Sequence, residues 1–165
     1  MRTGGHQYSG ACSTRDENIL VDLSNTFKSE EDFQYDESKN LLRVGVSYSL
    51  LELLNRLREK KSFLPTGQCV HVHLGGHLQT GGYGQLSRSH GLLCDHCVGF
   101  DIVLASGEHR KIWIPDSEMG DKNRTQKQKM LDDDLFWAGT VMIFFSNITD
   151  RRAIGEREIK YHIIQ

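Results

Sequence analysis

The sequence predicts an α+β fold in which a mixed β-sheet is flanked by helices. Two pairs of short apolar runs, each pair joined by a polar turn, are typical of β-hairpins. Between the two pairs, leucines recur at the spacing of one helical face, which predicts an amphipathic helix. The chain has 165 residues, which is enough for one domain with a sizeable core.

The first predicted strands lie in the N-terminal third of the chain. Residues 19–23 alternate apolar with other side chains, as expected of a half-buried strand. Phe33–Tyr35 and Leu41–Val46 predict a hairpin, because the polar residues 36–40 between them favour a turn.

A helix is predicted from about Leu50 to Lys61. Ser49 stands three residues before Glu52, the spacing of a capping box, and the lysines at the far end suit a helix C-terminus. The apolar stripe consists of Leu50, Leu51, Leu53, Leu54 and Leu57.

The second predicted hairpin pairs Phe100–Leu104 with Lys111–Ile114 across a turn at residues 105–108. The polar stretch Gly120–Asp134 is expected to be a loop, and Asp134–Ala138 a short helical start.

The final stretch, residues 139–165, has a weaker pattern. Val141–Phe145 is an apolar run of strand length, whereas Ile159–Ile164 is only intermittently apolar.

Composition excludes several classes of function. Twenty basic and 22 acidic residues give a net charge of −2, so a nucleic-acid partner is not expected. No apolar run is long enough to span a bilayer, and the N-terminus lacks the apolar core of a signal peptide. We therefore expect no membrane partner, and no cellular compartment is assigned.

Cysteines and histidines leave alternatives open. Cys94 and Cys97 form a single CxxC, which could be half a zinc site, a redox pair or two semi-buried thiols entering a strand; the last is favoured. His71 and His73 would share one face of a strand, and together with His77 they are the best metal alternative. We expect that these residues bind no metal.

Two glycine-rich stretches carry most of the functional information: residues 2–8 and residues 67–84, within a glycine-dense region 67–91 that is expected to be loop. Glycines allow several backbone N–H groups to converge on one phosphate. Neither stretch has the GxGxxG pattern of a Rossmann unit or the Gly-Lys-Ser/Thr of a P-loop.

Five landmarks in order resemble the FAD-binding domain of the berberine-bridge-enzyme-like, PCMH-type flavoprotein oxidases. They are Arg-x-Gly-Gly-His at Arg2–His6 with an aromatic at Tyr8, Gly67-x-Cys69 followed by Gly75-Gly76-His77 and Gly81-Gly82-Tyr83-Gly84, Leu86–Leu92 with Asp95, Phe100–Gly107, and Asp134–Ala138. The resemblance implies the second subdomain of such a domain, with FAD as the cofactor.

The resemblance also implies cofactor-binding residues. They are Arg2, Thr3, Gly4, Gly5, His6, Gln7, Tyr8, Gly67, Cys69, Val70, Val72, Gly75, Gly76, His77, Gly81, Gly82, Tyr83 and Gly84. His6 matches the position that bonds the flavin 8α-methyl carbon, and Cys69 the position that bonds C6. An imidazole and a thiolate are the nucleophiles that such bonds require.

By resemblance, the chain is a fragment of an FAD-dependent oxidoreductase that moves a hydride from a small-molecule substrate to flavin, with oxygen as the acceptor. Residues 1–138 match part of the domain and 139–165 form a divergent tail, in which Gly139–Ser146 replaces the family's glycine-rich segment. No catalytic base is assigned. The alternatives are a non-catalytic remnant of the fold and a His/Cys metal-binding module.

Overall fold

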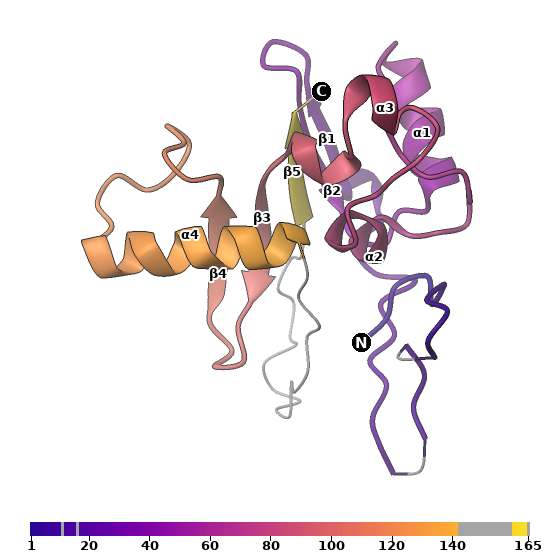
Figure 1. Cartoon of the computed structure of the whole chain (residues 1–165), viewed down its shortest axis with the longest axis horizontal. Helices are drawn as coiled ribbons and strands as arrows, with labels where there is room; N and C mark the ends of the chain where they lie inside the picture. The colour runs from indigo at the N-terminus through magenta and orange to yellow at the C-terminus, as the bar shows by residue number, and fades with distance from the viewer. Residues whose placement is uncertain (11, 16, 142–159, 165) are drawn as a thin grey trace.

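A single five-stranded sheet organises the chain (Figure 1). The computed structural model describes residues 1–10, 12–15, 17–141 and 160–164. The strands are β1 (Phe33–Asp36), β2 (Leu41–Gly45), β3 (Cys97–Val103), β4 (His109–Trp113) and β5 (Lys160–Ile164). Their spatial order is β1-β2-β5-β3-β4, and all four ladders are antiparallel. The predicted α+β class is confirmed. The sheet was expected to be mixed, but the pairings between its described strands are all antiparallel.

Both predicted hairpins are confirmed. In the first, β1 pairs with β2 from Phe33 opposite Val44 to Asp36 opposite Leu41. Its turn is closed by Asp36, whose Oδ1 accepts hydrogen bonds from the Ser38 N–H at 3.0 Å and the Ser38 hydroxyl at 2.6 Å. A short polar side chain that bonds the following backbone favours a turn over a continued strand. The second hairpin pairs β3 with β4.

The predicted strand over residues 19–23 is wrong. Within that segment, an isolated parallel bridge joins Asp22 to Arg2, and no strand forms there. The alternating apolar residues have no neighbouring strand to pair with, and Ile19 is exposed. Local alternation alone therefore misled here, because a strand needs a partner as well as a pattern.

Helical segments connect the strands, and the longest of them packs against β3 and β4. They are the 3₁₀ turns η1 (Glu30–Asp32) and η2 (Leu93–His96) and the α-helices α1 (Leu50–Glu59), α2 (Leu74–Gln79), α3 (Ser87–His90) and α4 (Gln126–Val141). The predicted helix is confirmed as α1. Ser49 caps it, because the Glu52 N–H donates to Ser49 Oγ at 3.3 Å and the Ser49 N–H donates to Glu52 Oε2 at 2.8 Å.

The expected polar loop over residues 120–134 is partly wrong, because α4 begins at Gln126. Thr125 starts the helix: its hydroxyl oxygen accepts from the Gln128 N–H at 3.3 Å, while Gln128 Oε1 accepts from the Thr125 N–H at 3.0 Å. This reciprocal pair is a capping box with glutamine in the third position. Of the predicted apolar run 141–145, Val141 ends α4 and the remainder lies outside the described residues.

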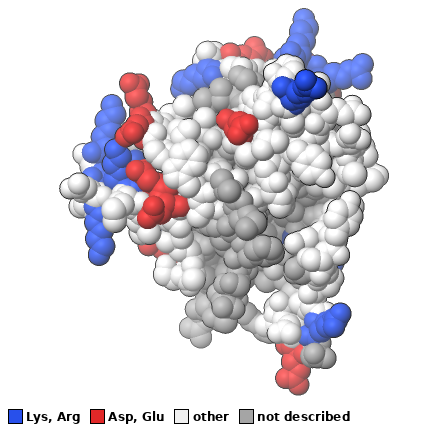
Figure 2. Space-filling view, viewed as in Figure 1, with Lys and Arg blue, Asp and Glu red and all other residues white. Residues whose placement is uncertain are grey.

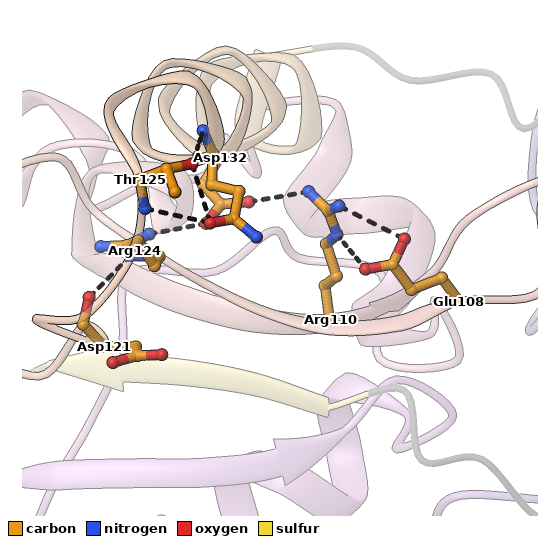
Figure 3. Close-up of polar contacts among 7 residues, drawn as sticks. Glu108, Arg110, Asp121, Arg124, Thr125 and Asp132 are labelled. Atoms are coloured by element: carbon orange, nitrogen blue, oxygen red, sulfur yellow. Dashed lines mark hydrogen bonds and ion pairs between the residues drawn. The ribbon is translucent and has the colours of Figure 1, made fainter.

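An ion cluster fastens α4 to β4 and to the loop before the helix (Figure 3). The buried Asp132 carboxylate accepts from Arg110 Nη1 at 3.2 Å and from Arg124 Nη1 at 2.7 Å. Arg110 also pairs with Glu108, its Nε lying 2.7 Å from Glu108 Oε1. Because Asp132 is shielded from water, these contacts are stronger than exposed ion pairs and fix the start of α4 against the sheet.

The core lies between the sheet and helices α1, α2 and α4. Phe136 of α4 stacks on Phe100 of β3, with ring centroids 6.1 Å apart. In Figure 1, α4 crosses in front of β3 and β4, while α1, α2 and α3 gather beside β1 and β2. The largest buried apolar side chains are Leu42, Tyr48, Leu50, Leu53, Leu57, Leu64, Leu74, Leu78, Leu93, Ile112 and Phe136. In the described part of the chain, no helix has the length and hydropathy needed to cross a membrane.

The strand β5 occupies the centre of the sheet, between β2 and β3. Its backbone pairs with β2 from Lys160 opposite Gly45 to Ile164 opposite Leu41. The ion pair between Arg43 Nη2 and the buried Asp101 Oδ2, 2.9 Å apart, joins the strands on either side of it. The C-terminal residues 160–164 are therefore integral to the sheet.

Candidate functional site

The first glycine-rich loop is pinned at its start to residues 21–23. The Arg2 N–H donates to Val21 O and the Leu23 N–H donates to Arg2 O, each at 2.9 Å. The Arg2 guanidinium lies on the Asp22 carboxylate, 2.8 Å away. Hydrogen bonds from Ser24, and then from Arg2, lower the pKa of Asp22 to about 2. Arg2, predicted to contact a cofactor, thus has its side chain engaged with Asp22.

The two predicted loops meet at the N-terminal end of α2. A Cβ built on Gly4 would lie 2.9 Å from His73 Cδ2, and a Cβ built on Gly75 would lie 3.3 Å from Thr3 Cγ2. Both contacts are too tight for a larger residue to fit without displacement of its neighbour. Glycine at these two positions therefore favours the close approach of the two loops.

The second loop is built on the core. The Gly75 N–H donates to Val46 O at 2.8 Å, and the Leu74 N–H donates to Tyr48 O at 2.9 Å. These bonds fix the beginning of α2 against the chain that leaves β2. Loops that carry function are often held in this way by a rigid scaffold.

Cys69 lies in an exposed turn before α2. The Val72 N–H donates to Cys69 O at 3.0 Å, and the Leu51 N–H donates to Val70 O at 3.0 Å, which holds the turn against the start of α1. Cys69 is exposed and forms no disulfide with another described cysteine. It is therefore accessible to a ligand that reaches this surface.

His77 acts as a clamp within the second loop. Its half-buried ring accepts a hydrogen bond at Nε2 from the Gly67 N–H at 2.8 Å, and a Cβ on Gly82 would lie 3.3 Å from the same nitrogen. Burial lowers the pKa of His77, so the ring is neutral at neutral pH and can accept this bond. The ring, predicted to contact a cofactor, thus also connects α2 to the segments on either side.

Acid is expected to weaken this clamp. The unfolded chain binds a proton at His77 near pH 6.5, whereas the folded chain resists protonation until the pH falls below its lowered pKa. The free energy of unfolding should therefore be fully retained above about pH 6.5 and fall as the pH drops below it. Urea unfolding between about pH 8 and about pH 5, the range in which histidine titrates, would measure the slope.

His77→Gln is the matched variant for this measurement, because a glutamine carbonyl oxygen can accept the Gly67 N–H bond but does not titrate. A smaller pH slope in His77→Gln than in the wild type is expected. Identical slopes would show that His77 contributes nothing to acid sensitivity, leaving the other groups of the chain responsible.

The remaining glycines of the second loop allow backbone segments to touch. A Cβ on Gly84 would lie 1.9 Å from Thr66 O, so the two backbones are in direct contact. Gly82 O accepts from the Leu93 N–H at 3.2 Å, and Gly81 O accepts from the Cys94 N–H at 3.0 Å. The expectation of loop throughout residues 67–91 is corrected here, because α2 and α3 are short helices within it.

Several predicted residues lie on the open side of the site. His6, Gln7, Tyr8 and Tyr83 are exposed, and Tyr8 makes no burying contact at all. Among the described residues, the His6 and Cys69 side chains are not hydrogen-bonded to each other. The structure thus brings the two loops together at Thr3–Gly4 and His73–Gly75 and leaves the side chains beyond them open to solvent.

The cysteine pair has the character of structural thiols. Burial raises the pKa of Cys97 to about 12 and also raises the pKa of Cys94. A thiol with a raised pKa is a poor nucleophile and a poor redox partner. Among the residues that the structure describes, no three His, Cys, Asp or Glu side chains gather as a metal site would require, and His73 makes only an isolated bridge rather than a strand.

His73 has a buried ring nitrogen that the sequence does not indicate. Its Nδ1 is buried and has no hydrogen-bond partner in the described structure. Burial, Lys28 and His6 lower its pKa, so the ring is neutral. From the sequence, His73 is a candidate metal ligand only, because a histidine two residues before Gly-Gly carries no signal of its own.

Backbone N–H groups of the first glycine-rich loop are available to an anionic ligand. The N–H groups of Gly4, Gly5 and His6 have no recorded partner among the described residues, and a Cβ on Gly76 would have no neighbour within 4 Å. Figure 2 shows that charged side chains gather at the start of α4 and are sparse over α2 and the loops that follow it. Binding there would rely on backbone donors, which glycine-rich loops supply.

The comparison with protein families agrees with this chemistry. Residues 1–112 match the family described as FAD binding domain. The chain is 40% identical over 108 residues to the FAD-linked oxidoreductase janO of Penicillium janthinellum, covering 66% of this chain and 23% of that protein. It is 33% identical over 141 residues to berberine bridge enzyme-like 12 of Arabidopsis thaliana, covering 84% of this chain and 23% of that protein.

Solved structures show the same fold. BBE-like 1 of Physcomitrella patens superposes with a TM-score of 0.71 at 25% identity, covering 98% of this chain and 30% of that one. Aclacinomycin oxidoreductase superposes with a TM-score of 0.69 at 28% identity, covering 98% and 29%. The chain spans about a quarter of the length of the curated relatives that it matches.

Proposed function

Because this chain belongs to the FAD-binding domain family, we propose that it is the flavin-holding part of an FAD-dependent oxidoreductase. Residues 1–138 form the partial FAD-binding domain in this proposal, and 139–165 are its divergent C-terminal part. When bound, the flavin supplies the hydride acceptor, while the protein supplies binding, orientation and electrostatics.

The observation that carries the proposal is the meeting of the two glycine-rich loops. Gly4 lies against His73 and Thr3 against Gly75, and the N–H groups of residues 4–6 have no backbone hydrogen-bond partner among the described residues. Two segments more than 60 residues apart in the sequence thus form one surface. A dinucleotide needs such contacts along its length, because each contact offsets part of the entropy lost on association.

His6 and Cys69 have separate roles in this proposal as the residues that bond the flavin covalently. Both side chains are exposed, so each can reach a ligand on this surface. An imidazole nitrogen of His6 can supply a lone pair, and the sulfur of Cys69 can act as a soft nucleophile. Two attachment points would hold the ring system in a single orientation, which lowers the entropic cost of positioning it.

Membership of the family also supports a class of substrate, although it names no particular compound. A small organic molecule donates the hydride and oxygen accepts the electrons in this proposal. The related protein of Streptomyces galilaeus, 32% identical over 143 residues, is named as an aclacinomycin oxidase. Its name supports oxidation of a small molecule as the class of reaction.

The proposal predicts that flavin remains with the chain after acid precipitation. The chain would be produced in the presence of FAD, precipitated, washed and examined for flavin absorbance. His6→Ala and Cys69→Ala are each expected to lower the retained flavin, and the double variant to lose it entirely, because each removes one nucleophile. His71→Ala is the matched control, since it removes an exposed histidine that has no attachment role in this proposal and should retain flavin.

Three results would contradict the proposal in different ways. Flavin that stays attached in the double variant would refute the two attachment sites. A colourless chain without metal, even when supplied with FAD, would indicate a remnant of the fold. Stoichiometric zinc in the purified chain would indicate a metal-binding module.

A further inference from the structure

We propose that Ser47 is a positioning residue for the flavin site: its buried hydroxyl group ties the anchor of the first glycine-rich loop to the anchor of the second, so that both loops can contact one cofactor. The inference rests on the proposed function, because it concerns how the two halves of that site are held together. Ser47 lies outside both glycine-rich loops and outside the five landmarks of the family.

The first loop is anchored through residues 21–23, which we call the first anchor. The Leu23 N–H donates to Arg2 O at 2.9 Å, within the isolated parallel bridge that joins Arg2 to Asp22. Leu23 is buried, whereas the loop that follows Arg2 is largely exposed. The position of Leu23 therefore determines where the first glycine-rich loop begins.

The second loop is anchored through residues 46–48, which we call the second anchor. Val46 O accepts the Gly75 N–H at 2.8 Å, and Tyr48 O accepts the Leu74 N–H at 2.9 Å. These two carbonyls stand on either side of Ser47 in the chain. The backbone around Ser47 is therefore fixed to the beginning of α2.

The hydroxyl group of Ser47 joins the two anchors directly. Ser47 Oγ donates a hydrogen bond to Leu23 O at 2.6 Å, and the serine has no exposed surface. The length is at the short end of the normal range for a hydroxyl donor, and water does not compete for a buried bond. One side chain thus connects the segment that holds Arg2 with the segment that holds Gly75.

The Leu23 carbonyl has a second set of donors, which makes the role of Ser47 testable. The Thr26 N–H and the Thr26 hydroxyl each donate to Leu23 O at 3.0 Å, from within the same turn. Removal of the Ser47 hydroxyl therefore leaves no unsatisfied carbonyl behind. What is lost is the connection between the two anchors.

The loops depend on this connection because they meet by packing. A Cβ built on Gly75 would lie 3.3 Å from Thr3 Cγ2, which places the Thr3 methyl group against the Gly75 backbone. Each such atom pair contributes little attraction by itself. A small shift of the first anchor relative to the second would separate the loops, and a cofactor could then contact only one of them.

The first measurement is amide hydrogen exchange on the full chain without flavin. In Ser47→Ala, the Leu23 amide should exchange about tenfold faster than in the wild type, because the first anchor loses one buried hydrogen bond. The Leu74 and Gly75 amides should keep their wild-type rates, since their bonds to the second anchor are unchanged. Amides in β3 and β4 provide the internal reference.

The second measurement is the nuclear Overhauser effect between the Thr3 methyl group and the α-protons of Gly75, which reports the meeting of the loops. The wild type should show this signal, and Ser47→Ala should weaken it. Thr26→Val is the matched control, because it removes a hydroxyl group from the same carbonyl without breaking the connection, and it should keep the signal.

Ser47→Cys is the rescue variant, because a thiol is close in size to the hydroxyl group and remains a weak donor. Its Leu23 exchange rate should fall between those of Ser47→Ala and the wild type. Wild-type Leu23 exchange and an undiminished loop signal in Ser47→Ala would overturn the inference. If Ser47→Ala does not fold, Ser47→Cys decides, and an exchange rate equal to that of the wild type would then overturn it.

A third measurement separates this inference from the proposed function. When the chain is produced with FAD, Ser47→Ala should retain about threefold less acid-stable flavin than the wild type, because separated loops offer fewer simultaneous contacts. Thr26→Val should retain as much as the wild type. A wild type that shows the loop signal but never retains flavin would refute the proposed function while supporting the connection made by Ser47.

Two results with flavin would overturn the positioning role itself. One is full flavin retention in Ser47→Ala although the loop signal is lost, which would show that the flavin does not need the two loops held together. The other is loss of flavin in Ser47→Ala with the loop signal intact, which would show a merely structural effect of the substitution.

Discussion

Gly45→Ala is expected to destabilise the whole domain, by roughly 3 kcal/mol or more, because the new methyl group meets backbone rather than a movable side chain. A Cβ at this position would lie 1.8 Å from Phe27 O and 2.6 Å from Phe27 C. Phe27 is itself in the left-handed region, with φ of 51°, and cannot withdraw freely. The clash would force either β2 or the segment before η1 out of position.

The effect should reach the candidate site, since Gly45 precedes Val46, whose carbonyl anchors Gly75. Urea unfolding followed by circular dichroism would measure the loss. Gly76→Ala is the matched control, because a Cβ there has no neighbour within 4 Å and alanine is favoured over glycine within a helix. If Gly45→Ala and Gly76→Ala unfold at the same urea concentration, the close backbone crossing at Phe27 does not exist.

Gly84→Ala is expected to open the second loop while the sheet stays folded. The added Cβ would lie 1.9 Å from Thr66 O and 2.8 Å from Thr66 C, so the two backbones must separate. Separation removes the contact beside Gly67, whose N–H is bonded to His77. The cost of about 1–3 kcal/mol is local, because no residue of the sheet is involved.

Hydrogen exchange at the Gly67 amide would measure this opening. Exchange in Gly84→Ala should be at least tenfold faster than in the wild type, which corresponds to about 1.4 kcal/mol. Amides in β3 and β4 provide the internal reference and should exchange at their usual rates. Unaltered exchange at Gly67 would mean that the loop tolerates the methyl group and that glycine at position 84 serves another purpose.

The elements that could be predicted from the sequence are those with local determinants. The helix α1 has a capping box and a leucine stripe, and both hairpins have turn residues between apolar runs. Each of these signals lies within about ten residues of the structure that it specifies. Such local agreement between pattern and fold is what makes an element readable from the chain alone.

The helix α4 was only partly predictable because its first half has no apolar face to bury. Met130 and Leu131 are both exposed, and the helix is held there by the ion cluster of Asp132 instead. Arg110, one partner in that cluster, lies more than 20 residues away in the sequence. A contact of that range leaves no mark on local periodicity.

In the candidate site too, local features could be predicted from the sequence and long-range contacts could not. The glycine positions could be identified as loop residues, but their reasons differ: Gly4 and Gly75 allow two loops to meet, whereas Gly84 allows one backbone to cross another. The clamp at His77 and the buried nitrogen of His73 depend on which segments lie together in space. Those facts follow from tertiary packing and are absent from the order of residues.

The central place of β5 has a consequence for how the chain is made. A ribosome releases the β1–β2 and β3–β4 hairpins well before residues 160–164, so the two inner edges, along β2 and β3, wait without a partner during synthesis. Unpaired strand edges readily recruit strands from other molecules. Until β5 is added, these two edges favour aggregation of the nascent chain, and pairing of β5 with β2 and β3 closes both edges at once.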